Sequence, residues 1–281
     1  MLDAILILFY EIGSKIVTVT ADNAANEKKA LRDMGLIHIG CFAHGLNLVI
    51  QNLLGSQPQL MSLKEKVTKV VSLTRQSPAA KERFEKCQTS TPILKLVQAV
   101  PHRWNSLFSS LERMILLKPS VILFMADEDG LDNFTFEDWN NMANVVRLLR
   151  PIYDITVELS SENHSTISKV IPLSNLLIQF YKHESQESPS GSISKDISTQ
   201  LHKELASRLG QVEETHVLGL ATILDPRFKN KLFQRPDRVA RTLKLLNDEA
   251  IKLAETSDAN DVEPVLKKAK QVIASVFEHI K

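Results

Sequence analysis

The first residue that could do chemistry is an acid at the expected end of a β-strand. Asp22 lies in the run T-A-D-N-A-A-N that starts at Thr20, and residues 16–20 are all β-branched. A carboxylate there can hold a metal ion, because the sheet fixes its position while the adjoining loop leaves coordination sites open. It can equally cap the helix expected to follow, a role that Asp fills well. Both roles stay open, and two-metal phosphoryl transfer would need several more oxygen ligands.

A cysteine and a histidine follow at the expected start of another helix. Cys41 and His44 form a Cys-x2-His pair in the run C-F-A-H-G-L-N-L. Such a pair is half of a zinc site, which Cys87 and His102 could complete. Structural zinc ligands normally come as two closely spaced pairs, however, and Cys87 is far from His102 in the sequence. The alternative is that Cys41 is a small core residue.

Arg103 and Trp104, in the run R-W-N-S, combine a positive charge with a flat ring just before an expected helix. A base stacked on an aromatic ring gains about 1–3 kcal/mol, so the pair could hold an extruded nucleotide. The alternative is that Trp104 anchors the core where helices meet.

Charge is balanced overall but not along the chain. The formal net charge is +1, which excludes a uniformly basic nucleic-acid binder. Residues 61–118 nevertheless contain 11 basic and 4 acidic residues, whereas residues 119–165 contain 2 basic and 9 acidic residues. The two blocks could form a phosphate-facing surface and its counterpart, or pair with each other across a helical bundle.

Composition narrows the class of protein. The hydrophobic share of 43% suits a globular core, and the 2 cysteines favour a reducing compartment over a disulfide scaffold. The apolar run of residues 4–10 is too short to span a bilayer, so we expect no membrane association. Glycine-rich phosphate loops, Ser-His-Asp spacing and CxxC pairs do not occur, which argues against the corresponding enzymes.

Periodicity predicts an α+β, predominantly α-helical protein. We expect a helix at 2–12, a strand at 15–20, a helix at 23–34 ended by Gly35, and a strand at 36–41. Helical patterns dominate after Cys41, while the serine-rich residues 184–199 are typical of a flexible linker. Further helices are expected from Asp225-Pro226 and over residues 238–254 and 262–280.

Four motifs in this order, T-x-D-N-A-A-N, C-F-A-H-G-L-N-L, R-W-N-S and L-D-P-R-F-K, resemble those of the hAT transposase family and its host-domesticated relatives with BED zinc fingers. The motifs span Thr20 to Lys229, most of the chain. The resemblance implies a truncated RNase H-like α/β core interrupted by a large helical insertion domain. On this basis we expect a partial core at 1–54, a helical insertion domain at 55–183, the linker at 184–199, and a C-terminal helical part of the insertion at 200–281.

The resemblance also assigns roles to residues. Asp22 matches the second acid of a DDE triad and so a possible magnesium ligand. His44 would lie near the catalytic pocket, and Trp104, with Arg103, would hold a base turned out of the duplex. The first and third acids have no match in this chain, so we expect no cleavage or joining of DNA by the chain alone. No cofactor would be required, and magnesium would bind only to an intact triad.

The expected function is therefore that of a transposon-derived, catalytically inactive, nuclear DNA-binding or regulatory factor. The expected partners are DNA and other proteins, or a second copy of the chain bound through regions outside this sequence. One alternative is a fragment of an active DDE transposase. Another is a helical scaffold that binds proteins through exposed apolar or acidic faces.

Overall fold

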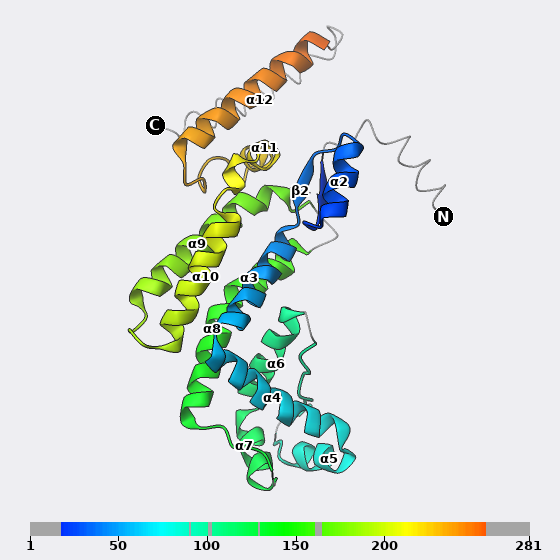
Figure 1. Ribbon diagram of the computed structural model, residues 1–281, viewed down its shortest axis with the longest axis vertical. Coiled ribbons are helices and arrows are strands. Elements are labelled where there is room, and N and C mark those ends of the chain that lie inside the picture. Colours follow the sequence, from blue (N-terminus) through cyan, green and yellow to red (C-terminus); the bar gives the residue numbers. More distant parts are fainter. Residues whose placement is uncertain (1–17, 90, 101–102, 129, 161–164, 257–281) are drawn as a thin grey trace, which may run out of the picture. The chain divides into compact units, whose positions relative to one another are not determined.

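Figure 1 shows a computed structural model of the chain, which describes residues 18–89, 91–100, 103–128, 130–160 and 165–256. The chain divides into two compact units, Met1–Gly45 and Leu46–Lys281, which are described separately. The division falls within a helix at residue 45, rather than at residue 54 as expected. The predicted helices at 2–12 and 262–280 and the first residues of the predicted strand at 15–20 lie outside the described residues.

The N-terminal unit is a strand–helix–strand unit. Strands β1 (Val19–Ala21) and β2 (His38–Gly40) pair in parallel, with Val19 opposite His38, and α2 (Ala25–Asp33) connects them. The chain can turn sharply after α2 because Gly35, with a φ of +69°, adopts the left-handed conformation that glycine tolerates best. The predicted order of strand, helix and strand is thus confirmed for the described residues.

The second unit is helical (Figure 1). Its helices are α3 (Phe42–Ser56, which begins in the first unit), α4 (Pro58–Gln76), α5 (Pro78–Lys86), α6 (Trp104–Leu116), α7 (Lys118–Ala126), α8 (Phe136–Leu159), α9 (Val170–Glu187), α10 (Ile193–Leu209), α11 (His216–Leu224) and α12 (Pro236–Thr256), with short 3-10 turns η2 (Ile167–Lys169) and η3 (Val212–Glu214). The predominantly helical fold is confirmed.

Polar residues at helix starts define several of these boundaries. The Ser77 hydroxyl accepts a hydrogen bond from the Ala80 amide at 3.2 Å, and Pro78 follows at the first helical position of α5. At α8, Thr135 and Asp138 form a capping box, in which each side chain accepts a hydrogen bond from the other residue's amide. These local bonds satisfy amides that a helix leaves unpaired at its start.

The core of the helical unit lies where α6, α8, α9 and α10 pack. Tyr181 on α9 is fully buried, and its hydroxyl donates a hydrogen bond to the Leu148 carbonyl on α8. Burial, followed by the nearby charge of Glu184, raises the pKa of the Tyr181 phenol well above its ordinary value. The largest fully buried side chains here are Tyr181, Phe108, Leu111, Met114, Met142, Leu148 and Leu149.

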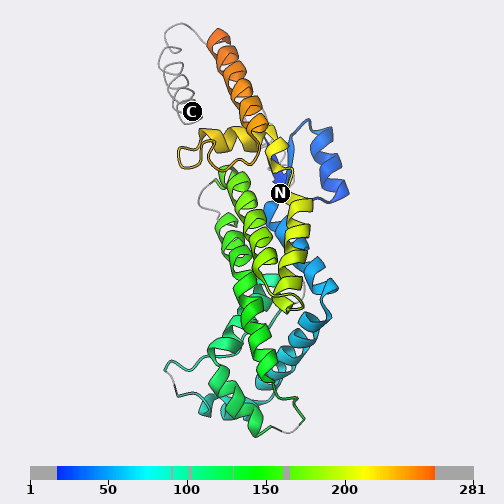
Figure 2. The ribbon, with the colours of Figure 1, turned by 90° about the vertical axis from the view of Figure 1, so that its left-hand side faces the viewer.

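The predicted flexible linker at 184–199 is wrong. Helix α9 continues to Glu187 and α10 begins at Ile193, so the two helices form a hairpin and lie side by side (Figure 2). The serines that suggested a loop have other roles: Ser192 caps α10 by accepting from the Lys195 amide, and Ser194 and Ser198 are buried. Small side chains let two helices approach closely, so a serine-rich composition here reflects packing.

The predicted helix start at Asp225-Pro226 is also wrong, because Asp225 follows the last residue of α11. Its carboxylate accepts hydrogen bonds from the Arg227 guanidinium and amide and from the Ser168 hydroxyl at 2.8 Å. The bonds from Arg227, and then the bond from Ser168, hold the pKa of Asp225 far below its ordinary value. Asp225 therefore ties the end of α11 to η2.

The contribution of Asp225 to stability should depend on pH. A carboxyl whose pKa is lowered by folding stabilises the protein above its unfolded-state pKa of about 3.9, and this contribution is lost as the pH falls toward the folded-state value. Asp225→Asn should lower the free energy of unfolding by about 1–2 kcal/mol at neutral pH and by less near pH 3. Urea denaturation at both pH values measures this. Asp154→Asn, on an exposed part of α8, is the control, and an equal loss for Asp225→Asn at both pH values would contradict the role.

Candidate nucleic-acid interface

Asp22 lies in the turn that follows β1. Its Oδ1 accepts a hydrogen bond from the Ala24 amide at 2.8 Å, while the N-cap of α2 is Ala24 and has no side-chain cap. Asp22 thus fixes the turn that leads into α2 instead of capping the helix through Asn26. The hydrogen bond from the Ala24 amide lowers the pKa of Asp22, although partial desolvation opposes it. A side-chain hydrogen bond with Glu27 and the charges of His44 and His38 lower this pKa further.

His44 lies in the first turn of α3 and is half-buried. It is close enough to Asp22 to favour the ionised carboxylate, and His38 places its Nε2 at 3.2 Å from the Asp22 carbonyl oxygen. The structure therefore brings two of the predicted site residues, Asp22 and His44, into one polar region at the ends of the two strands.

The described residues do not assemble a metal site. Among the residues that the structure describes, no three His, Cys, Asp or Glu side chains are placed to hold an ion together. Asp22 alone does not fit the ligand set that a magnesium-dependent triad needs. The zinc alternative is not tested, because His102 lies outside the described residues and Cys41 and Cys87 belong to different units. Burial, then the charge of Asp127, raises the pKa of the Cys87 thiol.

Trp104 is the first residue of α6 and is packed into the helical unit. Only 4% of its surface is exposed, and its ring meets Tyr153 of α8 edge to face at a centroid distance of 6.2 Å. Tyr153 in turn stacks on Phe108 at 4.3 Å. Trp104 is therefore a core anchor in this structure, as the second of the two sequence-based alternatives holds.

Beside Trp104 the surface is hollowed. A pocket of about 180 Å³ has Trp104 in its wall and Arg103 and Lys64 among its charged residues. Arg103 is exposed and Lys64 is half-exposed, so both can reach a ligand. The residues that line this pocket are Gln51, Leu54, Lys64, Thr68, Ala99, Val100, Arg103, Trp104 and Leu107. We call it the Trp104 pocket.

The two charged blocks pair with each other in part. Lys66 on α4 donates to Asp138 on α8 at 2.8 Å, and Arg83 on α5 binds Glu128 after α7. Hydrogen bonds from Lys66 and Thr135 lower the pKa of Asp138, outweighing the effect of its burial, which alone would raise it.

Several cations of the basic block have no such partner. In the part of the chain that the structure describes, no ion pair joins a carboxylate to Lys64, Lys69, Arg75, Lys95 or Arg103. Of these, only Arg103 is predicted as a site residue from its motif, whereas the charge excess of residues 61–118 is the signal that points to the others. None of the described helices is long and apolar enough to cross a bilayer.

Comparisons with known proteins find mainly proteins of the BED zinc finger type. Residues 39–148 match the family model described as the ZBED1 RNase-like helical domain. The chain is 28% identical over 240 residues to human zinc finger BED domain-containing protein 4, and this match covers 82% of the chain and 20% of that protein. It is 26% identical over 206 residues to the putative transcriptional regulator tpeD of Talaromyces stipitatus, covering 60% of the chain and 24% of that protein.

A plant protein extends the set. The rice zinc finger BED domain-containing protein RICESLEEPER 1 is 22% identical over 247 residues, covering 80% of the chain and 33% of that protein. The chain thus spans a fifth to a third of the length of these relatives. The comparisons and the four ordered motifs agree: the chain is similar to the BED-type zinc finger proteins, and its motifs resemble those of hAT transposases.

Proposed function

We propose that this chain is part of a transposase-derived regulatory protein of the nucleus, and that its helical unit contacts DNA. The observation that carries the proposal is that Lys64 and Arg103 lie at one surface pocket and pair with no carboxylate of the described residues. Cations without carboxylate partners are free to neutralise phosphates, which supply most of the affinity in protein–DNA binding. Relatives named as zinc finger proteins and as a putative transcriptional regulator support a regulatory role.

The proposal includes binding and no cleavage step. Among the described residues, Asp22 is one carboxylate where several oxygen ligands would be needed, and it already accepts the Ala24 amide. The parallel strand–helix–strand unit supports descent from an RNase H-like core, in which Asp22 now holds the turn before α2. DNA and further protein segments are the proposed partners.

Double substitution of Lys64 and Arg103 by alanine should weaken DNA binding and reduce its dependence on salt. Each phosphate contact contributes about 0.9 to the slope of log K against log salt for duplex DNA, so two lost contacts should reduce the slope by about 1.8. Fluorescence anisotropy of a labelled 20-base-pair duplex, at about 50 and 200 mM salt, measures both quantities.

The matched control is Lys182→Ala with Lys203→Ala, which removes the same charge from exposed positions on α9 and α10. It should leave the slope unchanged. If the unmodified chain does not bind DNA at low salt, the proposed function is wrong.

A second candidate function has its own observation. Helix α7 exposes Pro119, Ile122, Leu123 and Ala126, which are spaced as one face of a helix, with exposed fractions of 47% at Ile122 and 56% at Leu123. An exposed apolar face of this kind is typical of a protein-binding surface. Binding through it would be insensitive to salt, so the same titrations distinguish a protein scaffold from a DNA-binding unit.

A further inference from the structure

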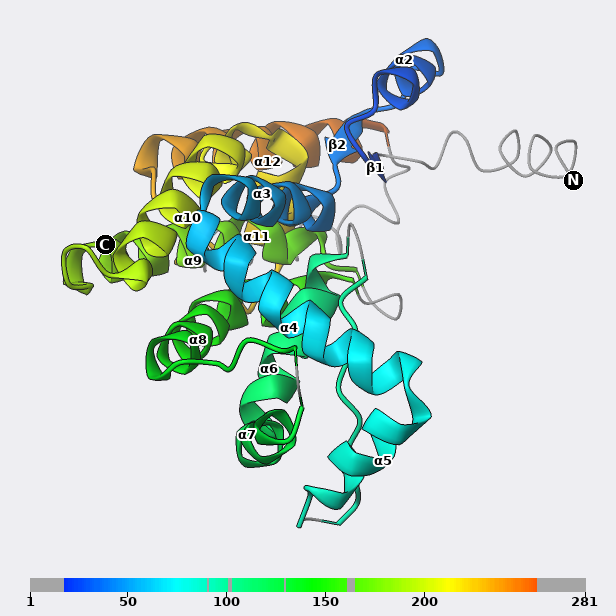
Figure 3. The same ribbon diagram turned by 60° about the horizontal axis from the view of Figure 1, so that its bottom comes forward.

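Helix α4 carries, on one face, two cations that have no carboxylate partner among the described residues. Lys64 and Arg75 are 11 residues apart, and at 100° per residue they differ by about 20° around the helix axis. At a rise of 1.5 Å per residue they are separated by about 16 Å along it. Lys64 lines the Trp104 pocket, whereas Arg75 lines a second pocket at the other end of the same helix. Figure 3 shows α4 running toward α5, with α6 beside it.

The segment between α5 and α6 lines both pockets. Ala99, Val100 and Arg103 contribute to the Trp104 pocket, and residues 94–96 contribute to the second one. Side chains hold this segment in place: the Gln88 amide exchanges two hydrogen bonds of 2.9 Å with the Leu94 backbone, and Arg113 donates to the Lys95 carbonyl at 2.8 Å. The two pockets therefore lie along one side of α4, and described residues of the connection between α5 and α6 line both of them.

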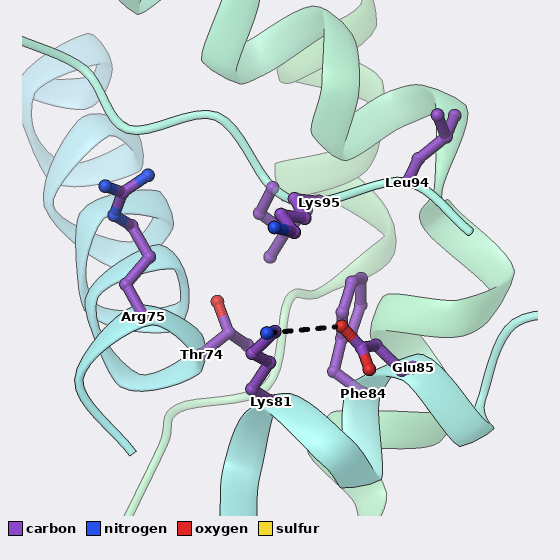
Figure 4. Close-up of a pocket in the computed structure, with 8 residues that line it drawn as sticks. Thr74, Arg75, Lys81, Phe84, Glu85, Leu94 and Lys95 are labelled. Carbon is purple, nitrogen blue, oxygen red and sulfur yellow. Dashed lines mark ion pairs between the residues drawn. The ribbon is translucent and has the colours of Figure 1, made fainter. Parts of the chain in front are cut away.

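The second pocket has a volume of about 220 Å³ and combines cations with an apolar floor (Figure 4). Figure 4 shows Arg75 on α4, Lys81 and Phe84 on α5, and Lys95 on the segment that passes above them. Phe84 and Leu96 are buried, with 3% and 4% of their surfaces exposed. The residues that line it are Thr74, Arg75, Lys81, Phe84, Glu85, Leu94, Lys95 and Leu96.

The charges of this pocket, which we call the Arg75 pocket, do not cancel. Its one carboxylate, Glu85, lies 3.8 Å from the Lys81 Nζ and compensates that cation. Arg75 and Lys95 are exposed and have no carboxylate partner among the described residues. Two uncompensated cations around a concave surface attract an anion more strongly than the same charges dispersed over a flat one.

We propose that the Arg75 pocket binds a backbone phosphate of the same nucleic-acid strand that contacts Lys64 and Arg103 in the Trp104 pocket. This inference rests on the proposed function and adds where the strand runs, namely along α4. A separation of about 16 Å corresponds to about five nucleotide steps of 3.4 Å in one strand of a duplex. Cations that recur along one helix face suit a polymer with regularly spaced charges, whereas an acidic peptide would need only one of the two pockets.

The test is double substitution of Arg75 and Lys95 by alanine in the full chain. The probes are a 20-nucleotide single strand and a 20-base-pair duplex, each titrated between about 50 and 200 mM salt. Loss of this phosphate contact should reduce the slope of log K against log salt by about 0.7 for the single strand or about 0.9 for the duplex. The probe with the larger loss of affinity, about tenfold at the lower salt, identifies the form of nucleic acid that lies along α4.

The control is again Lys182→Ala with Lys203→Ala, which removes the same net charge. Arg75 and Lys95 are exposed, so circular dichroism should show unchanged folding. If the wild-type chain binds DNA and the Arg75/Lys95 variant keeps its slope, the inference fails while the proposed function stands. A control variant that loses as much as the Arg75/Lys95 variant also overturns it, and so does polyglutamate displacing the probe as effectively as unlabelled DNA. Absence of DNA binding by the wild type overturns both.

Discussion

Replacing Trp104 with alanine should lower the free energy of unfolding by about 3–5 kcal/mol, which is the usual cost of deleting a buried aromatic side chain. The ring is 4% exposed and meets Tyr153 edge to face, so its removal leaves a cavity between α6 and α8. Because Tyr153 also stacks on Phe108, the loss should spread to the contact between these helices. Urea denaturation followed by circular dichroism measures the change.

Two control variants separate stability from binding at this position. Trp104→Phe keeps an aromatic ring and should recover most of the lost free energy. Arg103→Ala removes the neighbouring exposed charge and should leave stability nearly unchanged. If Trp104→Ala instead kept wild-type stability and lost DNA binding, the ring would be a base-stacking surface and its place in the core would be wrong.

The elements of the N-terminal unit could be predicted because short sequence segments encode each of them. A β-branched run, a helix and a glycine at the turn are each encoded within a few residues, and the structure confirms the resulting strand–helix–strand order where it is described. The motif around Trp104 identified an important position as well. It did not show whether the ring faces a ligand or the core, because that depends on Tyr153, which is nearly 50 residues away in the sequence.

The incorrect predictions share a physical cause. Serine-rich residues 184–199 were interpreted from composition, yet Ser194 and Ser198 are buried in a helix because small side chains permit close helix packing. Asp225-Pro226 has the residue types of a helix start, but its carboxylate is bound to Ser168, far away in the sequence. In both cases tertiary contacts decided the outcome over local propensity.

The candidate interface could be predicted only as a region. The charge excess of residues 61–118 located it, but which cations remain free depends on ion pairs across the fold. Lys66 is neutralised by Asp138, 72 residues later, and Arg83 by Glu128, 45 residues later. Lys64 and Arg75 share a face of α4 and have no such partner among the described residues. Their freedom to bind a ligand depends on contacts across the fold and not on the local sequence.

Glu213 should be the most important polar residue for the packing of the C-terminal helices. Its side chain lies in η3 and is buried, with 6% of the residue exposed. It accepts hydrogen bonds from the Asn175 side chain at 2.7 Å and from the amides of Gln234 and Arg235 at 2.7 and 3.2 Å. One carboxylate thereby joins α9, η3 and the residues directly before α12.

Glu213→Ala should therefore lower the free energy of unfolding by about 3 kcal/mol, because it leaves buried donors without an acceptor. Glu213→Gln should lose less, since its carbonyl oxygen can still accept the two bonds that Oε1 accepts, those from Asn175 and from the Gln234 amide. Urea denaturation measures the stabilities, and hydrogen exchange at the Gln234 and Arg235 amides reports local opening before α12.

The neighbouring Glu214 provides the control for this prediction. It pairs with Arg235 and Arg238 at the surface and is 45% exposed in its side chain, so Glu214→Ala should cost less than about 1 kcal/mol. Equal losses at the two positions would mean that the buried bonds of Glu213 contribute no more than a surface ion pair. A large loss at Glu213 alone, with faster exchange at Gln234 and Arg235, would show that a single buried acid holds the start of α12 against the rest of the helical unit.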